Sequence, residues 1–541
     1  MMHLTGQTET KTTLAGWELV LSGRGRKRAP RPAKQPNAKR NHTHMAQSLK
    51  TLFKSIELVK RHGEMDVTVE RLVTDSRRVV PGAVFFAIPG ISTDGNEYID
   101  EAIARGAQAI VSEEPYSVSY GSVSYLQVAD AREALATAGA SFYDHPDHQL
   151  QIVGITGTNG KTTVSRLVQY LLEEAQGDTG LIGTIQYDLG QRTLPAYKTT
   201  PESVDIYSIL SQMHQYGCSK CVMEVSSHAL DQKRVYQLAV NTAVFLNLSQ
   251  DHMDYHGNME NYYACKRRLF NGETGYAPSN ACVINIDDAY GRRLNDELKP
   301  QRDTITFGIE SEDAQIRARE VRLQQMGSAF DVHWPGGSAH IRTRLPGYYN
   351  VSNVLAALAV AYSHGMNLEQ IAPNISSFHG VPGRMEQVDA GQPYQVLVDY
   401  AHTDNALTHA LNMLRPITPG RLFVVFGCGG DRDRTKRPKM VEAVLKYADR
   451  AWATADNPRK EPLENIFEDM RAATSADTPI TFEWDRRSAI GEAISRAKEG
   501  DTVLIAGKGH ETFQEFADRV VPFDDRQIAR EWLELQNQQA S

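Results

Sequence analysis

The most informative segment of the sequence is Gly154-Ile-Thr-Gly157-Thr-Asn-Gly160-Lys161-Thr162-Thr163. It follows the apolar pair Ile152-Val153 and opens a segment whose apolar residues recur at helical spacing: Val164, Leu167, Val168, Leu171 and Leu172. Glycines let successive backbone N–H groups point at phosphate oxygens, while the helix N-terminus and Lys161 add positive charge. The glycines at 154, 157 and 160 define a narrower variant of the general P-loop pattern. The stretch therefore predicts a nucleoside triphosphate-binding loop between a strand and a helix.

Length and composition describe a multidomain globular chain. Its 541 residues suggest three or four domains, and 41% hydrophobic with 23% charged residues is an ordinary globular balance. No run of 18 apolar residues is present, so we expect no membrane insertion. Five scattered cysteines fit a reducing cytoplasm better than a disulfide framework, and we assign no metal to the Cys218/Cys221 pair.

Residues 1–44 differ from the rest of the chain. They carry nine basic and two acidic residues, whereas the whole chain has a net charge of −8. A basic, proline-containing segment without sustained apolar periodicity is typical of disorder, and it lacks the apolar core of a secretory signal. A transit peptide and a nucleic-acid-binding arm are conceivable. An upstream extension before a start at Met45 is an equally good interpretation.

The remaining chain predicts an α/β protein with three domains. We expect a small α/β domain over 45–147 and a central ATP-binding domain with a mainly parallel sheet over 148–382. A C-terminal, Rossmann-like α/β domain should follow over 383–541. Predicted central strands lie at 221–225, 242–248, 282–286 and 304–307, and C-terminal strands at 396–398, 422–426, 451–453 and 503–506.

Polar clusters follow the four C-terminal strands directly. They read Asp399-Tyr-Ala-His402, Gly427-Cys-Gly-Gly-Asp431-Arg432, Asp456-Asn457-Pro458-Arg459 and Gly507-Lys508-Gly509-His510-Glu511. Ligands of open α/β sheets gather outside the carboxyl ends of the strands. The four clusters therefore predict one binding crevice.

Two residues of the central segment are candidate metal ligands. Glu224 ends a strand-like run, where P-loop enzymes place an acidic ligand, and His252 lies in Asp251-His252-Met-Asp254-Tyr-His256-Gly. Each taken alone could equally be a core or surface residue. A triphosphate beside a carboxylate substrate needs compensating cations, and oxygen ligands suit Mg²⁺.

These motifs together resemble the Mur ligases of peptidoglycan synthesis, from about residue 46 to the end. The resemblance is carried by the glycine-rich loop, Glu224-Val-Ser-Ser-His228, the Asp251–Gly257 motif, Asn350-x-x-Asn353 and Gly383-Arg384. It is greatest for members that add the third amino acid, on account of Lys198-Thr-Thr-Pro201 and the run from Glu224 through Gln232 and Arg234. The resemblance implies ATP-dependent amide formation through an acyl phosphate.

The resemblance also implies the roles of individual residues. ATP would be bound by Gly157, Thr158, Asn159, Gly160, Lys161, Thr162, Thr163, Asn350, Arg384 and Asp399. Mg²⁺ would be held by Thr162, Glu224 and His252, and Lys161, Glu224, His252 and Lys266 would form the catalytic set. Lys266 matches a family lysine that becomes a carbamate, and a carbamate can bind Mg²⁺ as a carboxylate does. Without the resemblance, the sequence would predict that Lys266 is an ordinary solvated lysine on a helix.

The expected substrates follow from the same likeness. Contacts to UDP-N-acetylmuramoyl-L-alanyl-D-glutamate would come from Ser76, Thr199, Thr200, Ser226, Gln232, Arg234 and Lys266. One departure concerns the uridine loop, Gly90-Ile91-Ser92-Thr93-Asp94-Gly95, which lacks the histidine common in related enzymes. We expect a cytoplasmic monomer that does not bind nucleic acid.

The Asp456–Arg459 motif resembles that of enzymes that add meso-diaminopimelate. An arginine fork can bind the second carboxylate of diaminopimelate, which lysine lacks. The expected contacts are Arg432, Asp456, Asn457, Pro458, Arg459, Gly507 and Glu511. An L-lysine-adding member, a folylpolyglutamate-type ligase and a non-catalytic nucleotide-binding protein remain the alternatives.

Overall fold

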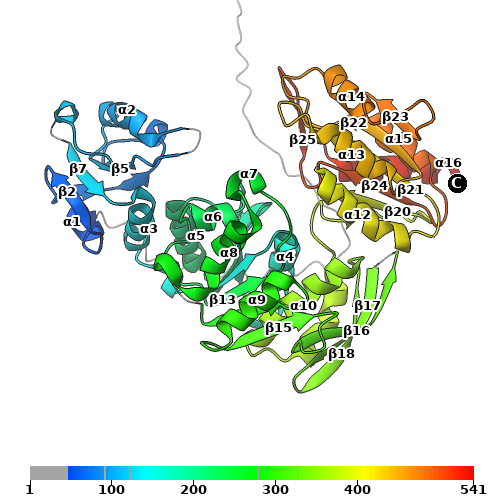
Figure 1. The fold of residues 1–541 in the computed structure, drawn as a ribbon, viewed down its shortest axis with the longest axis horizontal. Coiled ribbons are helices and arrows are strands. Elements are labelled where there is room, and N and C mark those ends of the chain that lie inside the picture. Colours follow the sequence, from blue (N-terminus) through cyan, green and yellow to red (C-terminus); the bar gives the residue numbers. More distant parts are fainter. Residues whose placement is uncertain (1–46, 91–92, 122, 278, 326, 541) are drawn as a thin grey trace, which may run out of the picture. The chain divides into compact units, whose positions relative to one another are not determined.

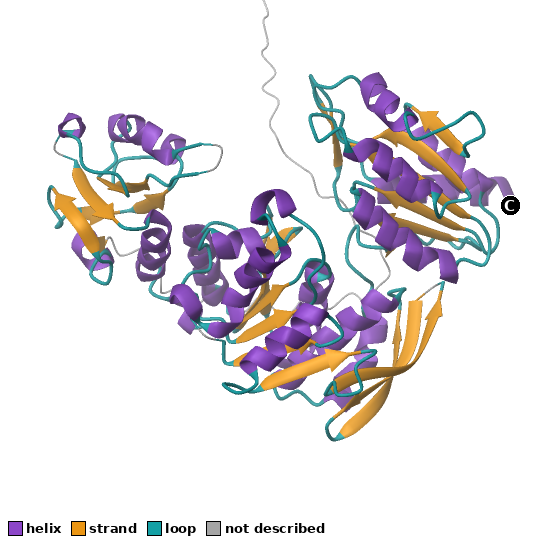
Figure 2. Cartoon of the chain, in the orientation of Figure 1, coloured by secondary structure: helices purple, strands orange, loops and turns teal. Residues whose placement is uncertain are grey.

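The computed structural model describes residues 47–540 apart from 91–92, 122, 278 and 326. The predicted extension 1–44 and the departing pair Ile91-Ser92 therefore lie outside the described residues. Three mixed sheets carry the architecture, each with helices on both faces (Figures 1 and 2). The predicted α/β class is confirmed.

The first sheet has the order β2-β7-β6-β5-β4 and is parallel except for β2. Its strands are β2 (Leu58–His62), β4 (Arg71–Val73), β5 (Ala83–Phe86), β6 (Ala109–Ser112) and β7 (Ser124–Val128). Helices α1 (Leu49–Leu52) and α3 (Ala131–Phe142) pack on one face. Helix α2 (Ile99–Ala104) packs on the other, so the sheet is buried on both sides.

The central sheet has eleven strands in the order β11-β10-β9-β12-β8-β13-β14-β15-β16-β17-β18. Their bounds are β8 (Gln151–Thr156), β9 (Thr179–Ile182), β10 (Gln186–Asp188), β11 (Thr193–Pro195), β12 (Lys220–Glu224), β13 (Thr242–Phe245), β14 (Ala281–Asn285), β15 (Thr304–Gly308), β16 (Ile316–Gln324), β17 (Gly327–Trp334) and β18 (Gly337–Thr343). The seven strands from β9 to β16 in that order are parallel, as predicted.

Two helical layers cover the parallel part of this sheet. Helices α4 (Lys161–Gln176) and α10 (Tyr348–Ser363) share one core cluster with the sheet. The opposite cluster contains α5 (Ser203–Gln215), α6 (Ser227–Asp231), α8 (Met259–Asn271) and α9 (Ala289–Leu298). Apolar strands such as β12, which is buried throughout, are the expected consequence of covering both faces.

The antiparallel edges of the central sheet were not predicted. Strands β16, β17 and β18 form a meander, and β10 and β11 form a hairpin at the other end. Their exposed positions alternate with buried ones, and they lack the continuous apolar runs that marked the parallel strands.

The third sheet has the order β19-β20-β24-β21-β22-β23 and is parallel except for β19. Its strands are β19 (Glu386–Gln387), β20 (Gln395–Asp399), β21 (Leu422–Cys428), β22 (Arg450–Ala455), β23 (Ile480–Glu483) and β24 (Thr502–Ala506). The four strands predicted to end in polar clusters, β20, β24, β21 and β22, are consecutive neighbours. Their carboxyl ends therefore meet at one edge of the sheet.

Helices cover both faces of this sheet as well. One face packs against α12 (Asp404–Ile417), α13 (Lys436–Leu445) and α14 (Leu463–Arg471), and the other against α15 (Arg486–Arg496) and α16 (Asp525–Ala540). The remaining elements are β1 (Gln47–Ser48), β3 (Thr68–Val69), α7 (Met253–His256), α11 (Leu368–Ile371), β25 (Phe513–Glu515), β26 (Val520–Pro522) and the 3-10 turns Ser76–Arg78, Gly95–Tyr98, Val118–Tyr120, Pro146–His148, Glu273–Gly275 and Ala372–Ser377. Among the described residues, no helix combines the length and the apolar character that crossing a membrane requires.

A buried ion pair joins the start of α15 to the start of α16. Arg486 donates to both carboxylate oxygens of Asp525 at 2.8 and 2.7 Å and to the carbonyl of Ala506, the last residue of β24, at 2.9 Å. Both charged side chains are fully buried. The pair therefore ties two helices to the strand end that carries one of the polar clusters.

We expect Asp525→Ala to lower the free energy of unfolding by about 3–5 kcal/mol, because it leaves the guanidinium buried without its anion. Urea denaturation followed by circular dichroism measures the change. Arg487→Ala is the matched control, since the neighbouring Arg487–Glu531 pair is exposed and should contribute less than about 1 kcal/mol. Equal losses in the two variants would contradict the argument.

Candidate active site

The glycine-rich loop adopts the predicted position between β8 and α4. Gly160 has a φ of 88°, and a Cβ there would lie 2.5 Å from Asn353 Oδ1. A Cβ on Gly157 would lie 2.8 Å from the Cβ of Leu246. Close packing at both positions, together with the left-handed backbone of Gly160, explains why these residues are glycines.

Two lysines converge on this loop. Lys161 Nζ donates to the carbonyls of Gly157 and Thr158 at 2.8 and 2.9 Å. Lys266, on α8, donates to the same Gly157 carbonyl at 3.1 Å and to Thr156 Oγ1 at 3.4 Å. Burial lowers the pKa of each amine, and the charge of Lys161 lowers the pKa of Lys266 further. Lys266 is 1% exposed, so it is not a solvated helix charge.

Glu224 lies at the end of β12, beside the loop. It is 1% exposed, and its Oε2 accepts hydrogen bonds at 2.9 Å from the hydroxyls of Thr162 and Thr184. Its Oε1 accepts from the Thr184 backbone N–H at 2.9 Å. The predicted Thr162–Glu224 pair is thus in direct contact. Thr184 is a partner that the sequence did not reveal, because the short turn after β9 carries no motif.

The residues predicted to bind the nucleotide peptide extend from the other side of Glu224. Thr200 Oγ1 donates to the Glu224 carbonyl at 2.9 Å and accepts from the Ser226 N–H at 3.1 Å. Arg234 donates to the Thr200 carbonyl at 2.9 Å and to Gln232 Oε1 at 2.6 Å. The fifth residue of this group, Thr199, contacts the hydroxyl of Thr184 at 3.1 Å. All five side chains therefore lie in one network with the metal-ligand candidate Glu224.

Ser76 belongs to a different part of the protein. Its hydroxyl donates to Glu101 Oε2 at 2.7 Å, within the first sheet's layer of 3-10 turns and helices. The neighbouring Asp75 and Arg77 pair with each other at 2.9 Å. The structure therefore shows a hydrogen-bonded Ser76 but does not bring it into the network around Glu224.

His252 is the least constrained of the metal-ligand candidates. It has a φ of 54°, precedes α7 and is about half exposed. Its ring packs edge-on against His228, with centroids 4.9 Å apart, and His228 lies 5.7 Å from the ring of His256. Burial lowers the pKa of His228, and burial together with His228 lowers the pKa of His256 to about 4. The sequence analysis assigned no role to His228 or His256, although both lie in the motifs that carry the family resemblance.

Asn350 approaches the loop through a partner. Its Oδ1 accepts from Asn353 Nδ2 at 3.0 Å, and Asn353 packs against Gly160.

Arg384 and Asp399 belong to the third sheet, where Arg384 precedes β19 and Asp399 is the last residue of β20. The Arg384 guanidinium lies 4.5 Å from the ring centre of Tyr400, and Asp399 accepts from the N–H groups of Met385 and Ala401 at 2.8 Å. Asn353 was not among the predicted ATP contacts.

The four strand-end clusters of the third sheet are in contact with one another, as predicted from the strand order. Asn457 donates to Glu511 Oε2 at 3.0 Å, and the fully buried Lys508 donates to Asn457 Oδ1 at 3.0 Å and to Glu511 Oε2 at 3.1 Å. A Cβ on Gly507 would meet Asp456 Oδ2 at 2.6 Å, so that position also requires glycine. Lys508 stands in the quoted motif but was not assigned a role.

Arg459 belongs to the same group of contacts. With a φ of 55°, it donates to the Gly430 carbonyl at 2.9 Å and to Glu515 Oε2 at 3.1 Å. Pro458 adjoins Gly430, and a Cβ on Gly429 would lie 3.1 Å from Arg459 Nη1 and 3.8 Å from Arg432 Cγ. All seven predicted amino-acid contacts are therefore brought together. Glu515 was missed, because it belongs to the small hairpin β25–β26 rather than to a strand end.

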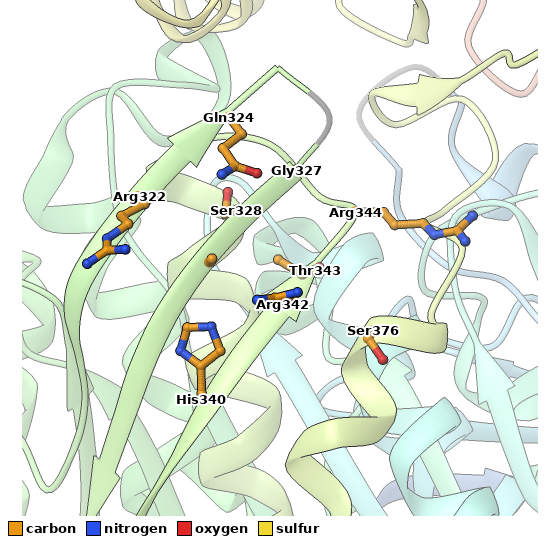
Figure 3. A pocket seen from close by; sticks show the side chains of 10 residues that line it. Arg322, Gln324, Gly327, Ser328, His340, Arg342, Thr343, Arg344 and Ser376 are labelled. Atoms are coloured by element: carbon orange, nitrogen blue, oxygen red, sulfur yellow. The ribbon is translucent and has the colours of Figure 1, made fainter. Parts of the chain in front are cut away.

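A separate cavity of about 430 Å³ lies on the meander β16–β18 (Figure 3). Its lining comprises Arg322, Gln324, Gly327, Ser328, Ala329, His340, Arg342, Thr343, Arg344 and Ser376. It contains none of the predicted site residues. The candidate active site is therefore defined by the hydrogen-bond networks described above and not by this cavity.

Comparisons with known proteins agree with the geometry. Residues 68–143 match "Mur ligase family, catalytic domain", residues 155–361 match "Mur ligase middle domain", and residues 383–509 match "Mur ligase, glutamate ligase domain". A protein of Solibacter usitatus (strain Ellin6076) is 45% identical over 466 residues, which are 86% of this chain and 93% of that protein. A protein of Geobacillus thermodenitrificans (strain NG80-2) is 44% identical over 87% of this chain and 96% of its own length. The chain belongs to the Mur ligase family.

Within that family, the relatives point to one member. Both proteins carry the name UDP-N-acetylmuramoyl-L-alanyl-D-glutamate--2,6-diaminopimelate ligase. A solved structure of a ligase with the same name superposes with a TM-score of 0.66 at 31% identity, covering 91% of this chain and all of that one. The predicted membership of a family of amide-forming ligases, and the resemblance to its diaminopimelate-adding members, are confirmed.

We expect Gly160→Ala to weaken binding of an ATP analogue at least about tenfold, because the left-handed backbone and the contact with Asn353 both oppose a Cβ. Isothermal titration calorimetry measures the affinity. Gly177→Ala is the matched control, since Gly177 ends the same helix with a φ of 96° but faces open space. That variant should bind the analogue normally, and a similar loss there would contradict a specific role for Gly160.

Proposed function

We propose that this chain joins meso-diaminopimelate to the D-glutamate of UDP-N-acetylmuramoyl-L-alanyl-D-glutamate, using ATP. The observation that carries the proposal is the continuous network from Thr162 through Glu224 to Thr200. This network joins the glycine-rich loop to the residues that resemble the peptide-binding signature, which supports the proposal. The names of the relatives support the substrate, and the strand-end crevice supplies a separate place for the incoming amine.

The first half-reaction transfers the γ-phosphoryl group to the substrate carboxylate and forms an acyl phosphate. Backbone N–H groups of residues 157–160 and the ammonium of Lys161 would hold the phosphates and offset their charge. The hydroxyl of Thr162 and the carboxylate of Glu224 fit Mg²⁺, because they are hard oxygen donors 2.9 Å apart. Bound Mg²⁺ would neutralise charge that develops on the transferred phosphoryl group. His252 would serve a second ion.

Lys266 is proposed to carry a carbamate. A neutral amine is the form that adds to CO₂: the nitrogen lone pair forms an N–C bond, and one proton leaves to solvent. Burial, and then the charge of Lys161 on the same Gly157 carbonyl, lower the pKa of Lys266 and so favour this neutral form. The product is an anion, so the repulsion between the two lysines becomes an attraction. It also adds carboxylate-like oxygens beside the metal-ligand candidates.

The second half-reaction requires the amine to displace phosphate through a tetrahedral intermediate. Glu511 would bind the distal ammonium of diaminopimelate. Asn457 orients the Glu511 carboxylate by donating a 3.0 Å hydrogen bond to it. Arg459 and Arg432, which both lie near Gly429, would bind carboxylates. L-Lysine lacks the second carboxylate and would leave one guanidinium without a partner.

We also place the reaction in the cytoplasm. All five cysteines are buried free thiols, which fits a reducing compartment. The monomeric state stays a prediction.

We expect phosphate release from ATP, with Mg²⁺ present, to require both the nucleotide peptide and meso-diaminopimelate. L-Lysine should support less than a tenth of the rate at equal concentration, because its side chain ends without the second carboxylate. Preferential use of lysine would overturn the choice of diaminopimelate as the amine but would leave the assignment as an ATP-dependent ligase intact. Phosphate release that does not depend on either amine would favour a nucleotide-binding protein of another kind.

Arg459→Lys should lower kcat/KM for diaminopimelate by roughly ten- to a hundredfold and leave KM for ATP unchanged, because a lysine cannot reproduce the planar fork. Steady-state kinetics with each substrate varied in turn separates the two effects. Arg519→Lys is a control on an exposed arginine in the same part of the chain. An increased KM for ATP would contradict the assignment of Arg459 to diaminopimelate binding.

Lys266→Ala should reduce ligation at least about a hundredfold, and short carboxylates such as acetate should restore part of the rate. Phosphate release measures both effects, and ¹³C-bicarbonate labelling of the wild-type protein reports the carbamate directly by NMR. Arg267→Ala is the control, because Arg267 pairs with Glu273 and Glu297 and does not contact the loop. Unchanged turnover of Lys266→Ala would refute the assignment.

A further inference from the structure

The short turn between α3 and β8 carries a compact group of metal-ligating side chains. His145, Asp147 and His148 each offer one ligand atom, and these atoms lie within 4.8 Å of one another. The two imidazole rings stack with centroids 5.2 Å apart and an interplanar angle of 14°. None of the three belongs to the ATP, peptide or amino-acid sites described above.

The backbone of the turn holds these side chains in place. His145 has a φ of 49°, and its N–H donates to the Ala140 carbonyl at 2.8 Å. The N–H of His148 donates to the His145 carbonyl at 3.0 Å, and Pro146 restricts the backbone between them. His145 and His148 therefore present their rings on the same side of the turn before any ligand binds.

Asp147 is the buried member of this group. Its side chain is only 1% exposed, and its Oδ2 accepts from the Ala239 N–H at 3.1 Å while lying 3.9 Å from His148 Nε2. Its other oxygen, Oδ1, is buried and has no hydrogen-bond partner among the described residues. A carboxylate that is buried and only partly hydrogen-bonded is costly, and a cation bound to it would offset that cost. The Ala239 N–H orients the carboxylate, as outer hydrogen bonds of metal ligands commonly do.

We propose that His145, Asp147 and His148 bind a divalent transition-metal ion of the Zn²⁺ class. Two imidazole nitrogens and one carboxylate oxygen are a common zinc ligand set, whereas Mg²⁺ and Ca²⁺ prefer oxygen alone. Zinc ligands at roughly 2.0–2.2 Å from the ion require donor atoms closer together than 4.8 Å. Small rotations of the two exposed rings toward the fixed carboxylate provide that approach, and water completes the coordination.

The site is distinct from the magnesium ligands of the proposed reaction. It lies before β8, while Thr162 and Glu224 lie after β8 and at the end of β12. Its expected effect is to cross-link the turn and stabilise the folded state by binding, without taking part in ligation.

The test uses the full-length protein, stripped of metal by a chelator and dialysed against Zn²⁺ with excess Mg²⁺. Metal analysis should find one more equivalent of zinc in the wild type than in His145→Ala or His148→Ala, with affinity at the turn lowered more than about tenfold in each variant. His409→Ala, which removes an exposed histidine of α12, is the matched control and should retain the full zinc content. Zinc held by the histidines near His252 contributes equally to all four proteins and cancels.

A second measurement guards against an effect on folding. Zn²⁺ should raise the Tm of the wild type and of His409→Ala but not of the two turn variants, and all four should have the same Tm without zinc. Co²⁺ in place of Zn²⁺ should give a visible absorption difference between the wild type and His148→Ala. Equal zinc content and equal cobalt spectra in all four proteins would overturn the proposal, whatever the outcome for the ligase reaction.

Discussion

The buried carboxylate of Glu224 is the constraint on which the catalytic half of this protein depends. Taking an ionised carboxylate out of water costs several kcal/mol unless hydrogen bonds replace its hydration. Here two threonine hydroxyls and one backbone N–H supply them, one from α4 and two from the turn after β9. Parallel pairing of β12 with β8 sets Glu224 opposite Ile155, just before the glycine-rich loop. The sheet register therefore brings the carboxylate beside the glycine-rich loop.

A balance of charges surrounds this group. Lys161 and Lys266 donate to the same Gly157 carbonyl, and burial together with the charge of Lys161 lowers the pKa of Lys266. The proposed carbamate at Lys266 would replace this repulsion with an attraction and would add oxygen donors beside Glu224. The burial and the charges that favour it are already present in the fold, so the proposal requires no additional residue.

Much of this arrangement could be predicted from the sequence, and the failures have physical causes. The glycine-rich loop and the strand ends were recognisable because their motifs lie at junctions between apolar runs and polar clusters. The antiparallel edges were not recognisable, since their half-exposed strands lack continuous apolar runs. Thr184 and Glu515 could not be identified, because a turn and a small hairpin bring them to Glu224 and Arg459 from a distance in sequence. The burial of Lys266 is likewise a property of packing, which a helical lysine does not reveal.

The strand ends of the third sheet are structurally independent of the layers that bury its strands. The strands β20, β21, β22 and β24 are buried by helices on both faces, whereas Asn457, Arg459 and Glu511 lie on the segments that follow them. Changes in these segments would alter the charges at this edge of the sheet without disturbing the apolar layers beneath. If these segments bind the incoming amine, as proposed above, evolution would need to change only a few loop positions to alter the amino acid that is added, while the glycine-rich loop and its sheet stay the same.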